Sequence, residues 1–116
     1  MGCVPVFAHV AELEFARLLD DCDLRWEFEP RSFVLRCDAE GRVREAVTPD
    51  FYLPELDLYV ELTTMRQTHV GSKRRKLRLL GERYPEVRVL LLVRRDLEAL
   101  GVVAETPVPA SVGSPA

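Results

Sequence analysis

Two acidic residues, Asp50 and Glu61, lie in neighbouring segments that have the composition of β-strands. These segments, 48–53 and 58–63, are joined by Pro-Glu-Leu-Asp, which is typical of a four-residue hairpin loop. If the residues that flank the loop pair with each other, the antiparallel register places Asp50 opposite Glu61, with Cβ atoms about 5 Å apart. Like charges at that distance repel each other. The pair is therefore either exposed to water or holds a cation, and the second alternative is a metal site.

Side chains alternate along the predicted hairpin and sort it into two faces. Pairing of Leu53 with Leu58 also predicts that Tyr52 lies opposite Tyr59. One face is apolar and consists of Phe51, Leu53, Leu58, Val60 and Leu62. The other face carries the two acids together with Thr48, Tyr52, Tyr59 and Thr63.

Basic residues concentrate in the segment that follows the hairpin, although the net charge of the chain is −3. Ser72 is of the residue type that caps helices, and we expect a helix over residues 73–84 that ends before Pro85. A basic helix of this kind binds the phosphates of a nucleic acid, or it is simply a solvated surface. The candidate phosphate-binding residues are Arg66, Lys73, Arg74, Arg75, Lys76 and Arg78.

The chain has only two lysines, Lys73 and Lys76, and both lie in this predicted helix. Each stands four residues before a leucine of the apolar stripe, Leu77 or Leu80, so both lysines extend that stripe toward the sheet. The helix is thus expected to point amines at the sheet and guanidinium groups at solvent or a polyanion. The alternative is that the lysine stems cover the core while the amines stay in water.

The remaining elements predict a mixed α/β fold. A helix over residues 8–22 carries Glu14 at the edge of its apolar stripe, where it leans toward the packing partner of the helix unless it is simply solvated. The apolar run 87–93 predicts a central strand that is buried on both faces, and it follows the hairpin through a parallel, right-handed βαβ crossover. Strands are expected at 24–28 and 33–37, and a weak strand at 43–47 leads through Thr48-Pro49 into the hairpin. With a closing helix at 96–100, the order is α-β-β-β-β-α-β-α, a mixed sheet flanked by helices.

Composition limits the class of protein. With 116 residues, 47% hydrophobic and 30% charged, the chain has the size of one small domain, which we place at residues 1–100, and the Pro-containing segment 101–116 is expected to be a disordered tail or linker. The longest apolar run is far shorter than the roughly 20 residues of a membrane span, and no signal peptide is expected. Three widely spaced cysteines favour free thiols in a reducing cytoplasm.

The order of these residues resembles the PD-(D/E)XK nucleases, whose core is that of the restriction endonucleases. The matching positions are Glu14 on the first helix, Pro49-Asp50 at a strand start and Glu61-Leu62-Thr63 on the next strand, followed by a helix. The resemblance implies that Asp50, Glu61, the carbonyl of Leu62 and Glu14 hold Mg²⁺ or Mn²⁺, hard cations that prefer oxygen ligands. The implied activity is metal-dependent hydrolysis of phosphodiester bonds in DNA, with RNA as the second choice.

Thr63 departs from the family pattern, which has lysine at this position. A threonine hydroxyl can hydrogen-bond a water molecule but brings no positive charge. Either the lysine has moved to another backbone position, with Lys73 or Lys76 reaching the same space, or the chain is a non-catalytic nucleic-acid-binding domain of the same fold. Both alternatives stay open on the sequence alone.

The segment 59–67, together with the basic segment after it, also resembles bacterial domains that are fused to phosphoribosyltransferases. The chain has no phosphoribosyl-binding loop, so that chemistry is not expected. The basic helix and the nuclease resemblance together favour nucleic acid as the partner, and no membrane association is expected. A homodimer or a fusion to another domain are further options.

Overall fold

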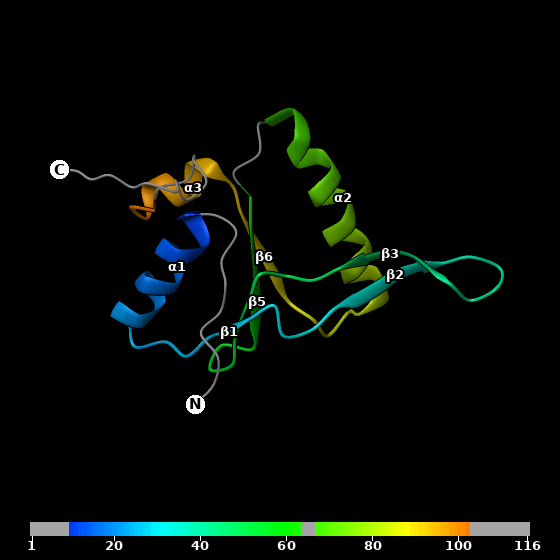
Figure 1. Cartoon of the computed structure of the whole chain (residues 1–116), viewed down its shortest axis with the longest axis horizontal. Helices are drawn as coiled ribbons and strands as arrows, with labels where there is room; N and C mark the ends of the chain where they lie inside the picture. The colour runs from blue at the N-terminus through cyan, green and yellow to red at the C-terminus, as the bar shows by residue number, and fades with distance from the viewer. Residues whose placement is uncertain (1–9, 64–66, 103–116) are drawn as a thin grey trace.

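The computed structural model describes residues 10–63 and 67–102. Within these residues, three helices and six strands follow one another (Figure 1). In order they are α1 (Val10–Asp21), β1 (Glu27–Phe28), β2 (Phe33–Cys37), β3 (Val43–Val47), β4 (Phe51–Leu53), β5 (Leu58–Leu62), α2 (Gln67–Arg83), β6 (Val89–Leu92) and α3 (Arg94–Ala99). The predicted mixed α/β class is confirmed, because a mixed sheet is flanked by helices.

The main sheet has the strand order β1-β4-β5-β6. Strands β1 and β4 are antiparallel, as are β4 and β5, whereas β5 and β6 are parallel. In the β4–β5 hairpin, Leu53 pairs with Leu58 and Tyr52 pairs with Tyr59. The predicted register is therefore confirmed. Asp57 closes the loop in the left-handed region with φ of 50°, a conformation that aspartate tolerates better than most residues.

The two faces of the hairpin contribute to two separate cores. Figure 1 shows α1 and α3 on one side of the sheet and α2 on the other. On the first side the apolar face packs in a cluster of Ala11, Phe15, Ala16, Leu19, Phe51, Leu53, Val60, Leu62, Leu97 and Val102. On the second side Tyr59 packs with Phe33, Leu35 and Leu80. The face that carries the acids is thus covered by α2 and β2 as well as by its own aromatic residues.

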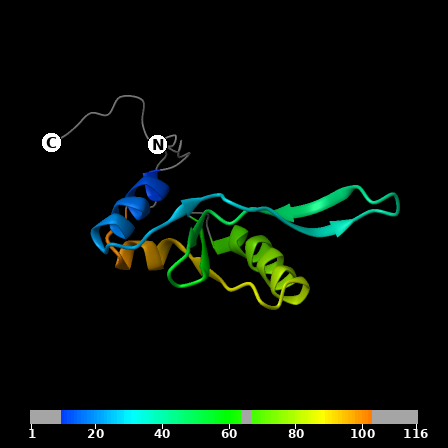
Figure 2. The same cartoon turned by 90° about the horizontal axis from the view of Figure 1, so that it is seen from below.

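Strands β2 and β3 form a separate two-stranded ribbon that projects beyond the main sheet (Figure 2). The sequence predicts a weak strand over 43–47 that leads through Thr48-Pro49 into the hairpin, and the chain leaves the extended ladder between Val47 and Phe51. Pro49 lies in this break and has no N–H to donate to a ladder. The base of the ribbon is held to α2 because the Tyr84 hydroxyl donates to the Val34 carbonyl at 3.0 Å and the rings of Phe33 and Tyr84 are in contact.

Two expectations about strands are wrong. Residues 87–93 were expected to form a central strand, but β6 is at the edge of the sheet and Leu90 is 45% exposed. An apolar run shows that a strand is mostly buried, but it does not show how many neighbours the strand has. The first strand is also shorter than the expected 24–28, because it begins only at Glu27. It ends at Phe28 as expected, and the positive φ of 47° at Glu29 breaks the extended conformation there.

Helix α2 begins at Gln67, six residues before the expected start, so Ser72 lies inside the helix and is not its N-cap. Burial of Val70 gives this first part of the helix a packing contact that outweighs the low helix propensity of its neighbours. The folded part of the chain also extends beyond residue 100, because Val102 is buried in the first core. Residues 103–116, most of the predicted tail, lie outside the described part. None of the helices in the described ranges is both long and apolar enough to cross a membrane.

Phe51 is the residue on which the first core converges. Its ring is fully buried and lies 5.3 to 5.5 Å, between ring centroids, from those of Phe15, Trp26 and Phe28. We expect Phe51→Ala to lower the free energy of unfolding by about 3–5 kcal/mol, because it removes these contacts and leaves a cavity. Leu56→Ala, at a 46% exposed position, should change it by less than about 0.5 kcal/mol. Urea denaturation measures both, and equal losses would contradict this description of the core.

Candidate active site

Asp50 and Glu61 are brought together at the end of the β4–β5 hairpin, and both are buried. Each acid accepts a hydrogen bond from a backbone N–H at or next to the other acid. The N–H of Leu62 donates to Asp50 Oδ2 at 2.8 Å, and the N–H of Asp50 donates to Glu61 Oε1 at 3.2 Å. The predicted acidic pair therefore exists, and it is not the solvated pair of the first alternative. Its charges need compensation inside the protein.

Lys73 supplies that compensation from α2. Its amine donates to Glu61 Oε2 in an ion pair and to the carbonyl of Leu62 at 3.3 Å. The Glu61 side chain is only 7% exposed and that of Lys73 is 27% exposed. The expectation that this lysine points toward the sheet is confirmed. Leu77 and Leu80 pack in the second core as the helical spacing predicts, and they set the rotation of α2 that aims Lys73 at the acids.

The cluster remains short of positive charge, since two carboxylates share one amine. Burial, and after it the charge of the neighbouring Glu61, raises the pKa of Asp50 from its usual 3.8 to about 7. The hydrogen bond from Leu62 and the charge of Lys73 act in the opposite direction but do not cancel this rise. A proton or a second cation therefore completes the charge balance near neutral pH.

The acid of the first helix that acts on this site is Glu12 and not the predicted Glu14. The charge of Glu12 contributes to the raised pKa of Asp50, whereas Glu14 forms an ion pair with Arg17 at 3.6 Å. Successive helical residues are about 100° apart, so these two glutamates lie on opposite flanks of the apolar stripe. The sequence gives the stripe but not which flank faces the hairpin, and this is why Glu12 was missed.

The predicted three-carboxylate set of Glu14, Asp50 and Glu61 is not formed. Among the side chains that the structure describes, those of residues 10–63 and 70–102, no group of three or more His, Cys, Asp or Glu lies close enough to hold a metal ion. The donors that do lie together are the carboxylates of Asp50 and Glu61 and the carbonyl of Leu62. These are oxygen donors, and Mg²⁺ commonly binds through one or two carboxylates while it keeps several waters and takes phosphate oxygens. The residues present therefore fit such an ion.

Thr63, which departs from the pattern that the chain resembles, is buried, and its N–H donates to the carbonyl of Leu92 at 3.0 Å. It thus joins the end of β5 to β6. The structure gives no charge to this position, and the only described lysine amine on the acids comes from Lys73 of the neighbouring helix.

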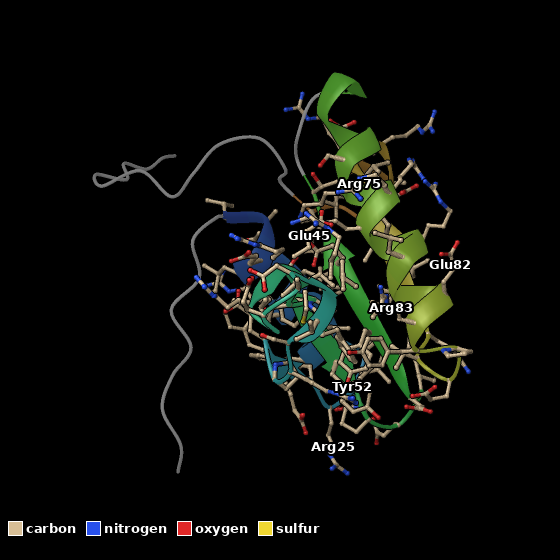
Figure 3. The ribbon with its side chains drawn as sticks, turned by 90° about the vertical axis from the view of Figure 1, so that its right-hand side faces the viewer. Arg25, Glu45, Tyr52, Arg75, Glu82 and Arg83 are labelled. Carbon is tan, nitrogen blue, oxygen red and sulfur yellow. The ribbon has the colours of Figure 1, made fainter. Side chains whose placement is uncertain are left out.

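The candidate phosphate-binding residues of α2 have different surroundings. Lys73 faces the acids, and Arg75 forms an ion pair with Glu45 of β3, toward which it points in Figure 3. This hydrogen bond to Arg75 lowers the pKa of Glu45. Arg74 and Arg78 are exposed and Lys76 is half-buried. Arg66 lies outside the described residues.

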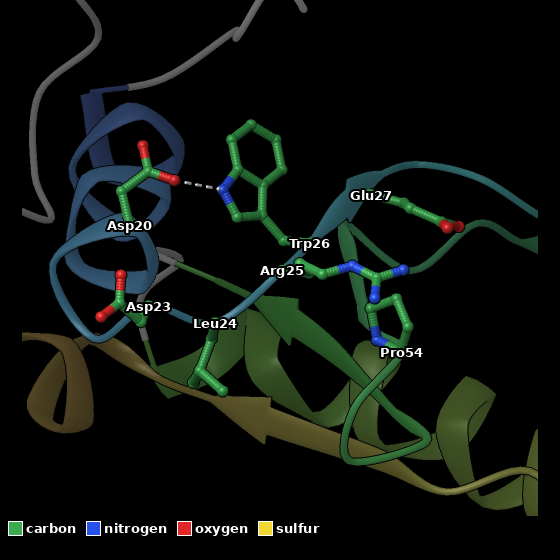
Figure 4. Close-up of a pocket in the computed structure, with 7 residues that line it drawn as sticks. All are labelled: Asp20, Asp23, Leu24, Arg25, Trp26, Glu27 and Pro54. Carbon is green, nitrogen blue, oxygen red and sulfur yellow. Dashed lines mark hydrogen bonds between the residues drawn. The ribbon is translucent and has the colours of Figure 1, made fainter.

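A pocket of about 440 Å³ lies elsewhere, between the end of α1 and the β4–β5 loop (Figure 4). It is lined by Asp20, Asp23, Leu24, Arg25, Trp26, Glu27 and Pro54, and it shares no residue with the acid–lysine cluster. Its acids are exposed, and the Trp26 indole N–H donates to Asp20 at 2.8 Å. We place the candidate site at the acid–lysine cluster and not at this pocket, because buried charged side chains in contact indicate a reactive site more strongly than the volume of a pocket does.

Comparison of the chain with protein-family models, curated proteins and solved structures gives no match. The assignment of chemistry to this cluster rests on its geometry and on the residue types.

The raised pKa of Asp50 predicts a pH dependence of stability. Between pH 4 and pH 7 the folded protein holds a proton on Asp50 that the unfolded chain releases, so the free energy of unfolding should fall as pH rises through this interval. Asp50→Asn removes the titrating group while keeping an oxygen that accepts from Leu62. We expect this variant to show a flatter pH profile and to be more stable than the wild type at pH 8 in the presence of EDTA.

Thermal unfolding from pH 4 to pH 8 measures this effect. Asp21→Asn, at an exposed position of the same chain, serves as the matched control and should follow the wild-type profile. Identical profiles for Asp50→Asn and the wild type would contradict a proton held on Asp50.

Proposed function

We propose that the chain is a metal-dependent nuclease of the PD-(D/E)XK type, with a restriction-endonuclease-like core, that hydrolyses phosphodiester bonds. The observation that carries this proposal is the amine of Lys73 on the Glu61 carboxylate, beside Asp50. Two acids on adjacent strands and one lysine are the side chains that such a nuclease needs. They converge here although the lysine comes from a different element than in the family pattern.

Asp50, Glu61 and the carbonyl of Leu62 are the proposed ligands of the ion. When bound there, Mg²⁺ or Mn²⁺ would supply an activated water and neutralise charge that develops on the scissile phosphate. The raised pKa of Asp50 supports this proposal, because a carboxylate pair with too little positive charge gains more from a dication than a pair that is already balanced.

Lys73 takes the role of the lysine that the nuclease pattern has at the position of Thr63. In this role its ammonium group stabilises negative charge on the phosphate or orients the attacking water, and its flexible four-carbon stem lets it reach the site from α2. Its contact with Glu61 favours Lys73 over Lys76 as the relocated lysine. The same contact favours an enzyme, because it places a positive charge beside the proposed metal ligands, where the reacting phosphate would lie.

The exposed side of α2 is the proposed substrate-binding surface. Arg74 and Arg78 are exposed on the helix that also carries Lys73. A phosphate backbone that lies along this helix would meet Lys73 where the helix approaches Glu61. We propose DNA as the first substrate and RNA as the second.

The cleavage assay uses labelled single-stranded, duplex and branched DNA, and a matched RNA, with Mg²⁺ or Mn²⁺. We expect Asp50→Asn, Glu61→Gln and Lys73→Met each to lower the cleavage rate by on the order of 10² or more, because each removes a group that acts on the reacting phosphate or water. Glu98→Gln, an exposed substitution of the same kind on α3, should cleave at the wild-type rate. Cleavage that survives Asp50→Asn or Glu61→Gln would sink the proposed site.

Binding is tested separately, with EDTA present so that the DNA stays intact. We expect Arg74→Ala/Arg78→Ala to weaken DNA binding and to reduce the slope of log K against log salt concentration by about 2, because each phosphate contact contributes about 1. The double variant Arg25→Ala/Arg95→Ala, at exposed positions outside α2, is the control. Salt-dependent binding by a wild-type protein that never cleaves would favour the non-catalytic domain instead, and equal slopes for both double variants would place the DNA elsewhere.

A further inference from the structure

We propose that the Lys73 amine and the divalent cation use the same oxygen atoms in turn. In the metal-free protein the amine is the resident cation of the site, and it leaves Glu61 and the Leu62 carbonyl when the ion binds. This inference rests on the proposed metal-dependent function and adds to it a coupling between ion binding and the position of the lysine.

The contacts of Lys73 are the first reason. Its amine donates to Glu61 Oε2 and to the Leu62 carbonyl oxygen. Both atoms belong to the donor set that fits Mg²⁺ or Mn²⁺. The lysine therefore occupies the ligands themselves and is not a neighbour that stands beside them.

The burial of Glu61 is the second reason. A carboxylate with a side chain only 7% exposed is stable in a protein when a cation accompanies it. Its other oxygen, Oε1, already accepts from the N–H of Asp50. The remaining Oε2 is thus the atom through which the cation acts, whether that cation is an ammonium group or a metal ion.

The two cations exclude each other at this position. Mg²⁺ binds oxygen at about 2.0–2.1 Å. An ammonium group that stayed on the same oxygen atoms would lie within a few ångströms of the ion and be repelled by it. The Lys73 amine can move away from the acids toward solvent, because its side chain is 27% exposed and its stem is flexible. Once released, the amine is free to contact a phosphate of the substrate. Ion binding therefore prepares the lysine, and the order of events is ion first and phosphate second.

The exchange makes a prediction that separates metal affinity from activity. Lys73→Met removes the competing amine while it keeps an unbranched side chain as far as the ε position. We therefore expect Mn²⁺ to bind this variant on the order of tenfold more tightly than the wild type, within the usual range of coupling between two ligands. Cleavage by the same variant should be lost. Lys76→Met, a matched change one helical turn away, should leave the Mn²⁺ affinity unchanged. Isothermal titration calorimetry and the electron paramagnetic resonance signal of free Mn²⁺ measure the affinity.

A second measurement needs no variant, because the chain has only two lysines. Trace acetylation of the wild-type protein, followed by mass spectrometry of the peptides, gives the reactivity of Lys73 relative to Lys76. We expect Mg²⁺ to raise this ratio severalfold, because the released amine becomes accessible. This measurement decides the question if Lys73→Met does not fold.

The outcomes distinguish the exchange from the function on which it rests. If Mn²⁺ binds the wild type, but Lys73→Met binds it equally or more weakly, or if Mg²⁺ leaves the labelling ratio unchanged or lowers it, the exchange is wrong and the metal site stands. If neither the wild type nor Lys73→Met binds Mn²⁺, the proposed metal-dependent function fails and the exchange fails with it. Tighter binding by Lys73→Met together with faster labelling of Lys73 supports the exchange.

Discussion

Glu61 is a carboxylate in the interior of a small protein, and such a group requires positive charge or a proton beside it. Strand β5 carries the acid, and α2, the next element of the chain, returns over the sheet and carries the amine. The rotation of α2 is set by leucines in the second core. Packing and charge compensation therefore constrain the same helix, so the candidate site depends on the core that lies beneath it.

The sequence predicts correctly those features of the fold and the site that depend on contacts between residues close together in the chain. The hairpin register follows from loop length and alternation, and it holds residue by residue from Phe51 to Leu53. The inward direction of Lys73 follows from its four-residue spacing to Leu77, because residues four positions apart lie on the same face of an α-helix. These two local rules together bring Asp50, Glu61 and Lys73 to one place, although no motif in the sequence joins all three.

The expectations that failed depend on packing between distant segments. Glu12 and Glu14 are equivalent in the pattern of α1, and only the way this helix lies on the sheet makes Glu12 the one whose charge reaches Asp50. The early start of α2 depends on the burial of Val70. The position of the β2–β3 ribbon beside α2 is likewise held by contacts between distant segments, because Tyr84 at the end of α2 contacts Val34 and Phe33 of β2.

The edge position of β6 has a consequence for how this domain can be built into larger assemblies. Strand β5, which carries Glu61, has neighbours on both sides, β4 and β6, so its hydrogen-bonding capacity is used within the domain. The sheet has two edge strands, the two-residue β1 and the longer β6, and among the described strands none pairs with the outer side of β6, where Leu90 is exposed. Another strand can therefore extend the sheet at this edge without changing any pairing of β4 with β5. A strand added at β6 would therefore leave β5, the strand that carries Glu61, in its present pairing.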